Sequence, residues 1–384
     1  MKKVVFIGAG AASITSAVLL KKREPSFEIT IVEKDKKIGR KLSMTGGGKC
    51  NIAPLKDDIS VYNKSSIPLL EELYKDIPLD EYLSLLQEIG VATKVIKDYG
   101  YYPVHESAPQ LVKNLYHQIN KLGIKISLDE FIDYANKDNK VIARLKSQEI
   151  EADYLVLATG GLSPVIKDVL DRHNIEVSKT LPGLCPIRVK EDVSALFGSR
   201  FEAIISLLYK KNIVKQYYGE VQFKKDALSG IPILNLSSLI SRRLIKEDID
   251  ISDYQIQIEL PKELVGNLSN KSIEEVLYSL YKEEYANYII NKHHLNKKDL
   301  VNSSKVSELL KERFTVSSLY DFENAQVTVG GVELDQLDTN FALKQNRHIF
   351  IVGEALNVDG ICGGYNLRFA ITSGFMAVNS MLKN

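Results

Sequence analysis

The chain of 384 residues contains no tryptophan and only three cysteines, Cys50, Cys185 and Cys362. Three cysteines without a Cys-x-x-Cys spacing are too few for a disulfide framework, which favours a reducing compartment. No apolar run reaches the roughly 18 to 20 residues that a membrane helix requires. The apolar start of the chain breaks at Gly8 and continues as an amphipathic segment, unlike a signal peptide. We therefore expect a cytoplasmic protein with no membrane partner.

An excess of charge of either sign is also missing, since 50 Lys and Arg face 49 Asp and Glu. This balance argues against a dominant field for polyanions, although it leaves room for a local basic patch. The histidines form no metal-binding pattern. His293 and His294 are adjacent, point to different sides of a helix and lack a carboxylate at helical spacing. We expect both to face solvent and predict no metal site.

The beginning of the chain has the pattern of a β-α-β unit. A strand at 3–7 (KVVFI) runs into GAGAAS at 8–13, a helical stretch continues to about Arg23, and a second strand (EITIVE) ends at Glu33. Glycines at 8 and 10 permit a tight turn and the close approach of a pyrophosphate to the helix N-terminus. Ser13 stands where a third glycine is usual. The acid at Glu33 has the usual spacing from this turn and suits an unphosphorylated adenosine ribose, meaning FAD or NAD ahead of NADP.

The pattern that follows predicts a doubly wound sheet. Helical periodicity covers about 66–76, 79–89 and 108–122, and the buried strand of DYLVLATGG (153–161) ends in two glycines. Three short strands lie between these segments: GIKISL (123–128), EFIDYA (130–135) and KVIARL (140–145). We expect them to form a three-stranded antiparallel excursion.

A change of character after Pro182 predicts inserted segments, and the length of the chain favours two or three packing units. Short β-like runs (EAIISLLY, NIVKQYY, GEVQF and YQIQIEL) surround the helical stretch ILNLSSLISRRL, and 262–313 is mostly helical in pattern. We predict an α/β fold with three parts. They are a Rossmann-like FAD-binding domain of residues 1–185 and 326–384, a β-barrel-like insertion of 186–260 and 314–325, and a small helical insertion of 261–313.

Nucleotide-binding features return at the end of the chain and favour FAD over NAD. Strand IFIV ends at Gly353-Glu354, a glycine-rich loop crosses 360–364, and a helix is expected from about Tyr365 to Leu382. A glycine followed by a carboxylate suits the ribityl chain of FAD, which NAD does not have. The free N–H groups at 365–367 would face N1 and the C2 oxygen of the flavin ring, where a helix N-terminus stabilises the reduced form.

The loop at 39–53 (GRKLSMTGGGKCNIA) contains three consecutive glycines. A glycine triplet costs chain entropy and buries no side chain, so the backbone itself must be needed there. We expect Gly46, Gly47 and Gly48 to lie against the pyrophosphate and the flavin, where side chains would collide.

Together, GAGAAS, Glu33, GRKLSMTGGGKCN, ATGG and GEALNVDGICGGYN make the whole chain resemble the HI0933-like or YhiN-like family of FAD-dependent oxidoreductases. The resemblance rests on Gly48-Lys49-Cys50-Asn51, on Gly353-Glu354 and on Gly363-Gly364-Tyr365-Asn366-Leu367. It implies a Rossmann-like FAD domain with β-barrel and helical insertions. The central family stretch is kept in part as GEVQFKKDALSGIP, with departures at Lys224, Lys225, Ala227 and Ile231 and in Leu-Cys-Pro at 184–186.

The family resemblance implies hydride transfer through flavin N5 but does not transfer a substrate. Because no second G-x-G-x-x-G follows residue 161, a reduced nicotinamide, NADH or NADPH, is expected to visit the flavin transiently. We expect a reductase of a conjugated carbon–carbon double bond. Two alternatives stay open: a uridine reductase (dihydrouridine synthase) acting on ribosomal RNA, for which the paired basic residues of the insertions are suited, and an oxidase of a small amine or aminoketone that forms peroxide. The oligomeric state is not predicted.

The residues expected at the cofactor come from every motif named above. They are Gly8, Gly10, Ala11, Ala12, Ser13, Glu33, Lys34, Arg40, Lys41, Gly46, Gly47, Gly48, Cys50, Asn51, Ile132, Ala158, Thr159, Gly160, Gly161, Gly353, Glu354, Asp359, Gly363, Gly364, Tyr365, Asn366 and Leu367. No catalytic residue stands out, and the weak candidates are Lys49, Cys50, Tyr365 and Asn366.

Overall fold

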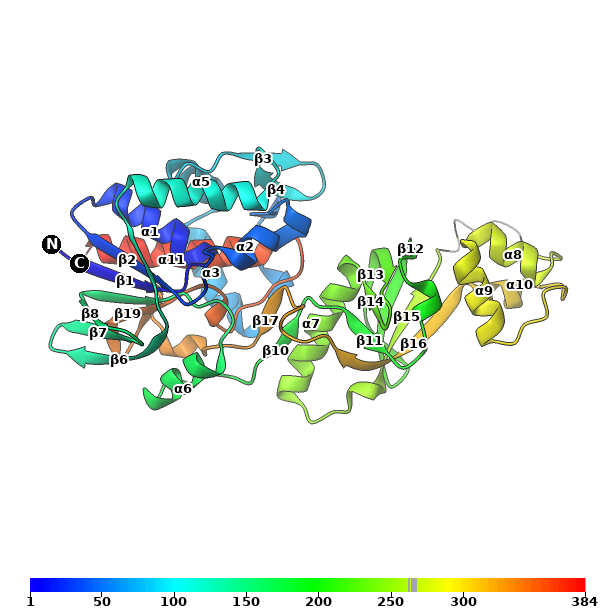
Figure 1. Cartoon of the computed structure of the whole chain (residues 1–384). Coiled ribbons are helices and arrows are strands. Elements are labelled where there is room, and N and C mark those ends of the chain that lie inside the picture. Colours follow the sequence, from blue (N-terminus) through cyan, green and yellow to red (C-terminus); the bar gives the residue numbers. More distant parts are fainter. Residues whose placement is uncertain (262, 264–267, 384) are drawn as a thin grey trace. The chain divides into compact units, whose positions relative to one another are not determined.

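The computed structural model describes residues 1–261, 263 and 268–383. The chain forms two compact units, one of Met1–Thr180 with Val327–Asn384 and one of Leu181–Gln326, and Figure 1 labels the elements of both. The division of the second unit into a barrel-like and a helical domain stays a prediction. Part of that predicted helical domain, 262 and 264–267, and the terminal residue 384 lie outside the described residues.

The first unit is built on a six-stranded sheet in the order β18-β19-β9-β1-β2-β5. All neighbouring pairs are parallel except β18 with β19. The strands are short apolar runs because both faces of the sheet are covered. Their bounds are β1 (Lys3–Ile7), β2 (Glu28–Glu33), β5 (Lys125–Leu128), β9 (Tyr154–Leu157), β18 (Ala342–Leu343) and β19 (Asn346–Ile351).

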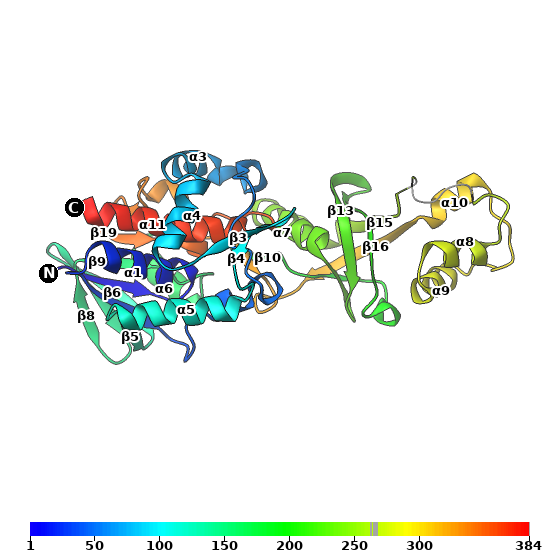
Figure 2. The ribbon, with the colours of Figure 1, turned by 90° about the horizontal axis from the view of Figure 1, so that it is seen from above.

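Three long helices lie together over this sheet, with α1 (Ala11–Arg23) between α11 (Tyr365–Lys383) and α5 (Ala108–Lys121), as Figures 1 and 2 show. Helices α1 and α11 approach closely at Gly374, where a side chain would collide with the Ser16 hydroxyl and would lie 3.1 Å from the Ala12 carbonyl oxygen. Other elements of this unit are α2 (Arg40–Met44), α3 (Ile67–Asp76), α4 (Leu79–Glu88), the hairpin of β3 (Thr93–Ile96) and β4 (Gly100–Pro103), α6 (Pro164–Arg172) and β17 (Val327–Val329).

The predicted antiparallel excursion is shifted by one strand. GIKISL supplies β5, which pairs in parallel with β2 in the main sheet, with Leu128 beside Glu33. The three-stranded antiparallel sheet is β6 (Phe131–Lys137), β7 (Lys140–Leu145) and β8 (Glu149–Ala152). The prediction failed because helix α5 precedes β5, and a strand-helix-strand crossover returns the chain to the parallel sheet rather than to a hairpin.

The second unit contains a closed barrel in the strand order β11-β14-β13-β12-β15-β16. The runs NIVKQYY and GEVQF, expected as separate, form the single strand β13, because Gly219 continues the ladder opposite Ala203. The strands are β11 (Ile187–Val189), β12 (Arg200–Tyr209), β13 (Asn212–Phe223), β14 (Ala227–Ser229), β15 (Tyr254–Glu259) and β16 (Lys311–Leu319); β10 (Leu181–Gly183) precedes them.

One hydrophobic cluster joins the barrel interior to the helical segment of the second unit. Phe201 and Phe223 from the barrel strands contact the ring of Tyr285, and Phe314 contacts that of Tyr288, both in α9 (Glu283–Lys292). The helices of this unit are α7 (Ile231–Lys246), α8 (Ile273–Leu280), α9 (Glu283–Lys292) and α10 (Ser303–Leu309). The predicted fold class, a Rossmann-type α/β fold with a barrel insertion and a helical segment, is confirmed.

Both adjacent histidines are exposed, as predicted, and His293 also has an acidic partner. Its Nε2 lies 2.7 Å from the carboxylate of Glu312 in β16, which is 5% exposed and also accepts a hydrogen bond from Lys292. This partner belongs to a different element, so helical spacing within the segment could not reveal it. Of the helices in the described part of the chain, none combines the length and apolar character needed to cross a bilayer.

Candidate functional site

The turn between β1 and α1 is fixed by a glycine that no other residue can replace easily. Gly8 has φ +95°, and a methyl group on it would lie 2.6 Å from the carbonyl oxygen of Ala158 after β9. Its amide donates to the Val32 carbonyl, and the Ala158 amide donates to the Ile7 carbonyl. The loops after β1 and β9 are thus held side by side at the carboxyl ends of their strands, the edge where nucleotides bind in such sheets.

Backbone amides hold the side chain of Glu33 at the carboxyl end of β2. The carboxylate at the end of β2 accepts hydrogen bonds from the Ala9 amide at 2.8 Å and the Asp35 amide at 3.0 Å. A carboxylate can accept about four hydrogen bonds, so these two leave capacity for a pair of hydroxyl groups. Ala9 lies directly before Gly10, so this contact ties the Glu33 carboxylate to the glycine turn.

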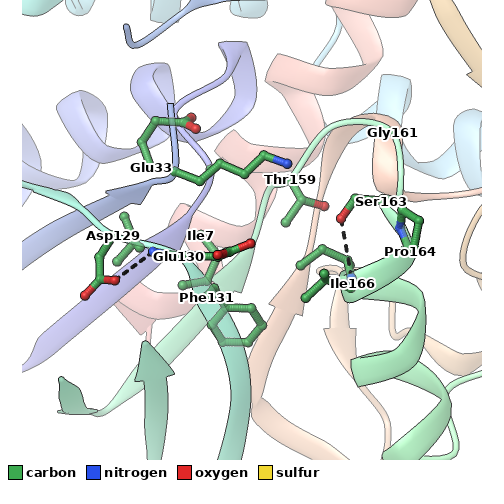
Figure 3. A pocket seen from close by; sticks show the side chains of 14 residues that line it. Ile7, Glu33, Asp129, Glu130, Phe131, Thr159, Gly161, Ser163, Pro164 and Ile166 are labelled. Carbon is green, nitrogen blue, oxygen red and sulfur yellow. Dashed lines mark hydrogen bonds between the residues drawn. The ribbon is translucent and has the colours of Figure 1, made fainter. Parts of the chain in front are cut away.

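A cavity of about 290 Å³ opens beside Glu33. Figure 3 shows Glu33, Phe131 and Thr159 around it, with Ser163 at the N-terminus of α6 on the far wall. The Ser163 hydroxyl caps α6 by accepting from the Ile166 amide at 3.4 Å. The cavity therefore combines acid, apolar ring and hydroxyl, a set suited to an adenosine. Its lining residues are Ile7, Gly8, Val32, Glu33, Lys34, Asp129, Glu130, Phe131, Thr159, Gly161, Ser163, Pro164, Val165 and Ile166.

Several of these lining residues were missed from the sequence. Asp129, Glu130 and Phe131 follow β5, whose end lies beside the end of β2. Recognising GIKISL as a strand of the main sheet would have placed them at this edge. The predicted residue here, Ile132, is 43% exposed and lies outside the cavity lining, because successive side chains of a strand point to opposite faces.

The glycine triplet forms a tight turn with its backbone turned outward. Gly46, Gly47 and Gly48 have φ values of +56°, +63° and +87°, which side chains rarely adopt. A methyl group on Gly47 or Gly48 would meet no atom within 4 Å. The open face of this turn is therefore accessible to a ligand, and the Cys50 amide closes the turn by donating to the Thr45 carbonyl.

The C-terminal strand brings a second acid to the same edge. Glu354 accepts a hydrogen bond from the Thr328 amide at 2.9 Å and lies 3.4 Å from the Lys41 ammonium group. Methyl groups added to Gly160 and Gly161 would approach the Glu354 carboxylate at 3.6 and 3.2 Å. The Glu354 carboxylate therefore lies close to Lys41, Gly160 and Thr328, although the sequence separates these residues widely.

The first turn of α11 packs against the segment that follows the glycine triplet. A methyl group on Gly364 would lie 2.6 Å from Asn51 Oδ1 and 2.7 Å from the carbonyl carbon of Ala53. The structure therefore places the end of the 43–53 loop beside the glycine-rich loop of 360–364. Two segments from opposite ends of the sequence are therefore adjacent in the structure.

The open backbone and the unpartnered polar atoms of this region fit a long ligand that carries a pyrophosphate. A methyl group on Gly10 would meet nothing within 4 Å, so the N-terminus of α1 is open to an anion. Two buried polar atoms, Thr159 Oγ1 and Asn51 Oδ1, have no hydrogen-bond partner within the described residues. Buried polar atoms are rarely left so unless a ligand or water completes them. The residues present fit an FAD that extends from the Glu33 cavity toward Asn51.

The four weak catalytic candidates differ in what their side chains are free to do. The Asn366 amide group binds the backbone of Gly360 and Ile361, which makes it a brace for the glycine-rich loop. Lys49 is exposed and lies 3.7 Å from Glu106. Burial raises the pKa of the Cys50 thiol to about 11, which keeps it protonated at neutral pH. Burial also raises the pKa of Tyr365, so its phenol remains a proton donor.

The other predicted residues take varied places. Lys34 lines the cavity, whereas the exposed Arg40 lies 3.8 Å from Asp35. Asp359 is buried under the glycine-rich loop, where its backbone exchanges hydrogen bonds with Asn63. Ser13, at the place of the expected third glycine, is fully buried. The close approach to α1 occurs at Gly353 instead, where a methyl group would lie 3.3 Å from Ala12 Cβ.

Comparison with curated proteins finds relatives along nearly the whole length. A 3-dehydro-bile acid delta(4,6)-reductase of Clostridium scindens is 24% identical, and a ribosomal RNA dihydrouridine synthase of Haemophilus influenzae is 26% identical; each match covers 98% of this chain and 98% of the relative. Among solved structures, a 3-ketosteroid delta1-dehydrogenase from Sterolibacterium denitrificans matches with a TM-score of 0.51 at 9% identity, covering 100% of both chains. This last likeness shows the fold alone.

The family comparison agrees with the geometry. Residues 2–380 match the HI0933-like protein Rossmann domain, which is nearly the entire chain. The glycine turn, the acid at Glu33 and the C-terminal segments described above all lie within this match. The chain therefore belongs to the HI0933-like family of FAD-dependent oxidoreductases and is an enzyme of that class.

Proposed function

We propose that this enzyme is an NAD(P)H-driven reductase of a conjugated carbon–carbon double bond. The observation that carries the proposal is the junction of the 43–53 loop with the first turn of α11, where Gly364 contacts Asn51 and Ala53. This junction supports a flavin ring held beside the two segments, with the adenosine at Glu33. FAD, when bound, supplies hydride transfer at N5.

The residues of this chain have separate roles in that proposal. Gly8, Gly10 and the N-terminus of α1 bind the pyrophosphate, and Glu33 holds the adenosine ribose. Glu354, fixed by the Thr328 amide, accepts a hydrogen bond from the ribityl chain. The amides of the first turn of α11 stabilise negative charge on the reduced ring.

Tyr365 is the residue that we propose as proton donor to the reduced substrate. It stands at the start of α11, and burial keeps its phenol protonated by raising its pKa. The thiol of Cys50 is a weaker choice, because its side chain is completely buried, whereas Tyr365 is partly exposed. A positioned general acid commonly contributes 10²- to 10⁴-fold.

Two relatives support reduction rather than oxidation. One relative is a reductase and the other a dihydrouridine synthase, and both names describe the addition of hydrogen to a double bond. The second name also favours an alternative function, reduction of uridine in ribosomal RNA. Against it, several paired basic residues already have acidic partners, as in Lys210 with Asp253 and Arg243 with Glu247.

The test is anaerobic stopped-flow reduction of the purified protein by NADH and by NADPH, followed by reoxidation with a conjugated enone. We expect fast reoxidation by the enone and slow reaction with oxygen. Reoxidation only by ribosomal RNA would favour the alternative. Failure of both nicotinamides, or peroxide formation driven by an amine, would refute the proposed reductase.

A further inference from the structure

A guanidinium group is completely buried one turn into α11. Arg368 has no exposed surface and is the largest fully buried side chain of the described residues. Its own amide makes an early intrahelical hydrogen bond of α11, to the Gly364 carbonyl at 2.9 Å. A buried arginine is rare unless it is paired, so hydrogen-bond acceptors are expected around the Arg368 guanidinium.

Every side of this guanidinium is occupied. Nε and Nη2 donate to the two oxygens of Asp57 at 3.1 and 3.0 Å, which is the two-point geometry that arginine forms with carboxylates. Nη2 also donates to the Ile77 carbonyl at 2.6 Å, and Nη1 donates to the Thr372 hydroxyl. The rings of Tyr74 and Tyr82 lie 4.3 and 4.5 Å from its centre.

The two tyrosines connect Arg368 to both walls of the proposed flavin site. The Tyr82 hydroxyl donates to the Ile52 carbonyl at 2.9 Å, next to Asn51. On the other side, the Tyr62 hydroxyl donates to the Tyr365 carbonyl at 2.7 Å, and the Tyr74 hydroxyl lies 2.7 Å from that of Tyr62. Since Tyr62 has one proton and gives it to Tyr365, Tyr74 is the donor to Tyr62.

We propose that Arg368 is a positioning residue for the flavin ring, and this inference rests on the proposed FAD site. Through Tyr82 it fixes the segment at 51–53, and through Tyr74 and Tyr62 it fixes the first turn of α11. Asp57 neutralises its charge at close range, so its effect on the flavin comes from the placement of these two backbone segments rather than from its own field.

A positional role and a charge role predict different results for lysine. Lysine keeps the charge but forms neither the two-point contact with Asp57 nor the planar packing between two rings. We therefore expect Arg368→Lys and Arg368→Met to behave alike. Both should loosen the amides of the first turn and reduce the preference of the site for reduced over oxidised flavin about tenfold, which is a fall of about 30 mV for a two-electron couple.

The experiment measures the midpoint potential and absorbance spectrum of bound FAD in the full-length protein, together with thermal unfolding. Tyr62→Phe and Tyr82→Phe keep the packing and remove one hydroxyl each, so they test the proposal even if the arginine variants do not fold. We expect both to lower the potential by a smaller amount. Tyr285→Phe, a buried tyrosine of the second unit, is the matched control and should leave the potential unchanged.

Three results would overturn the proposal. Recovery of the wild-type potential in Arg368→Lys would show a charge effect. Lower thermal stability in Tyr62→Phe and Tyr82→Phe, with unchanged potential and spectrum, would show a role in the core only. A wild-type protein unable to bind FAD would refute both this inference and the proposed site. Wild-type protein that binds FAD but reduces no enone would count against the proposed substrate alone, because the potential does not depend on turnover.

Discussion

Individual glycines show where backbone conformation, rather than side-chain chemistry, builds this site. Gly8 combines a positive φ with contact to the Ala158 carbonyl, whereas Gly123 has φ +69° but open space around its missing side chain. A side chain at position 123 would therefore cause conformational strain alone, whereas one at position 8 would cause both strain and a collision. Gly8 alone also lies against the predicted pyrophosphate position.

We expect Gly8→Ala to lower the free energy of unfolding by roughly 2 to 4 kcal/mol, since strain and collision add, and to abolish FAD binding. Gly123→Ala, the matched control, should cost about 1 to 2 kcal/mol from strain alone and leave FAD binding intact. Urea unfolding and titration of flavin fluorescence measure the two effects. Equal destabilisation by both variants would contradict the collision.

The buried thiol of Cys50 predicts a loss of stability in alkali. Burial raises its pKa in the folded protein from the ordinary 9.0 to about 11. Below pH 9 the thiol is neutral in both states, so its burial carries no penalty from ionisation. Between pH 9 and 11 only the unfolded chain ionises, and stability falls by roughly 2 to 3 kcal/mol before levelling off.

Urea unfolding of the FAD-free protein at several pH values between 8 and 11.5 measures this loss. Other groups also titrate in this range, so the difference between wild type and Cys50→Ala isolates the thiol. We expect the variant to show a shallower decline above pH 9. Parallel curves would mean that the Cys50 thiol ionises as easily in the folded protein as in the unfolded chain.

At the scale of elements, the close contact of α1 with α11 depends on the residue at position 374. Gly374 is unfavourable inside a helix by about 1 kcal/mol relative to alanine. It is tolerated because Ser16 and the Ala12 backbone occupy the place where its side chain would lie. The Ser16 hydroxyl is itself buried without a hydrogen-bond partner among the described residues.

This contact predicts a non-additive pair of mutations. Gly374→Ala should destabilise the protein by about 1 to 3 kcal/mol despite the better helix propensity, because the added methyl collides with the Ser16 hydroxyl. Ser16→Ala alone should be nearly neutral or stabilising, since it removes an unpaired buried hydroxyl. The double variant should recover much of the loss in urea unfolding. Additive effects would show that the helices separate instead.

Local sequence was enough to predict the elements whose partners are implied by spacing. The β1-α1-β2 unit, the acid at Glu33 and the glycine turns could all be derived, because each depends on a few neighbouring residues. Other features depend on which strands become neighbours. Asp129 and Phe131 reach the cavity only because β5 pairs with β2, and Arg368 finds Asp57 from the other end of the chain. No periodicity within a segment contains that information.

At the scale of the whole molecule, each unit has its own hydrophobic cluster. All residues of the proposed FAD site belong to the first unit. FAD should therefore stabilise that unit directly, by about 2.7 kcal/mol at a hundredfold excess over its dissociation constant. The second unit has no described residue in this site.

Calorimetry with and without FAD should then resolve two transitions, of which only one moves to higher temperature with the cofactor. A cavity variant in each cluster assigns them: Phe314→Ala should lower the transition that FAD does not move, and Phe369→Ala the one that it does, because each removes a fully or almost fully buried ring. A single transition that shifts as a whole, and responds equally to both variants, would show that the two units unfold together. In that case binding energy at the nucleotide edge would stabilise the barrel as well.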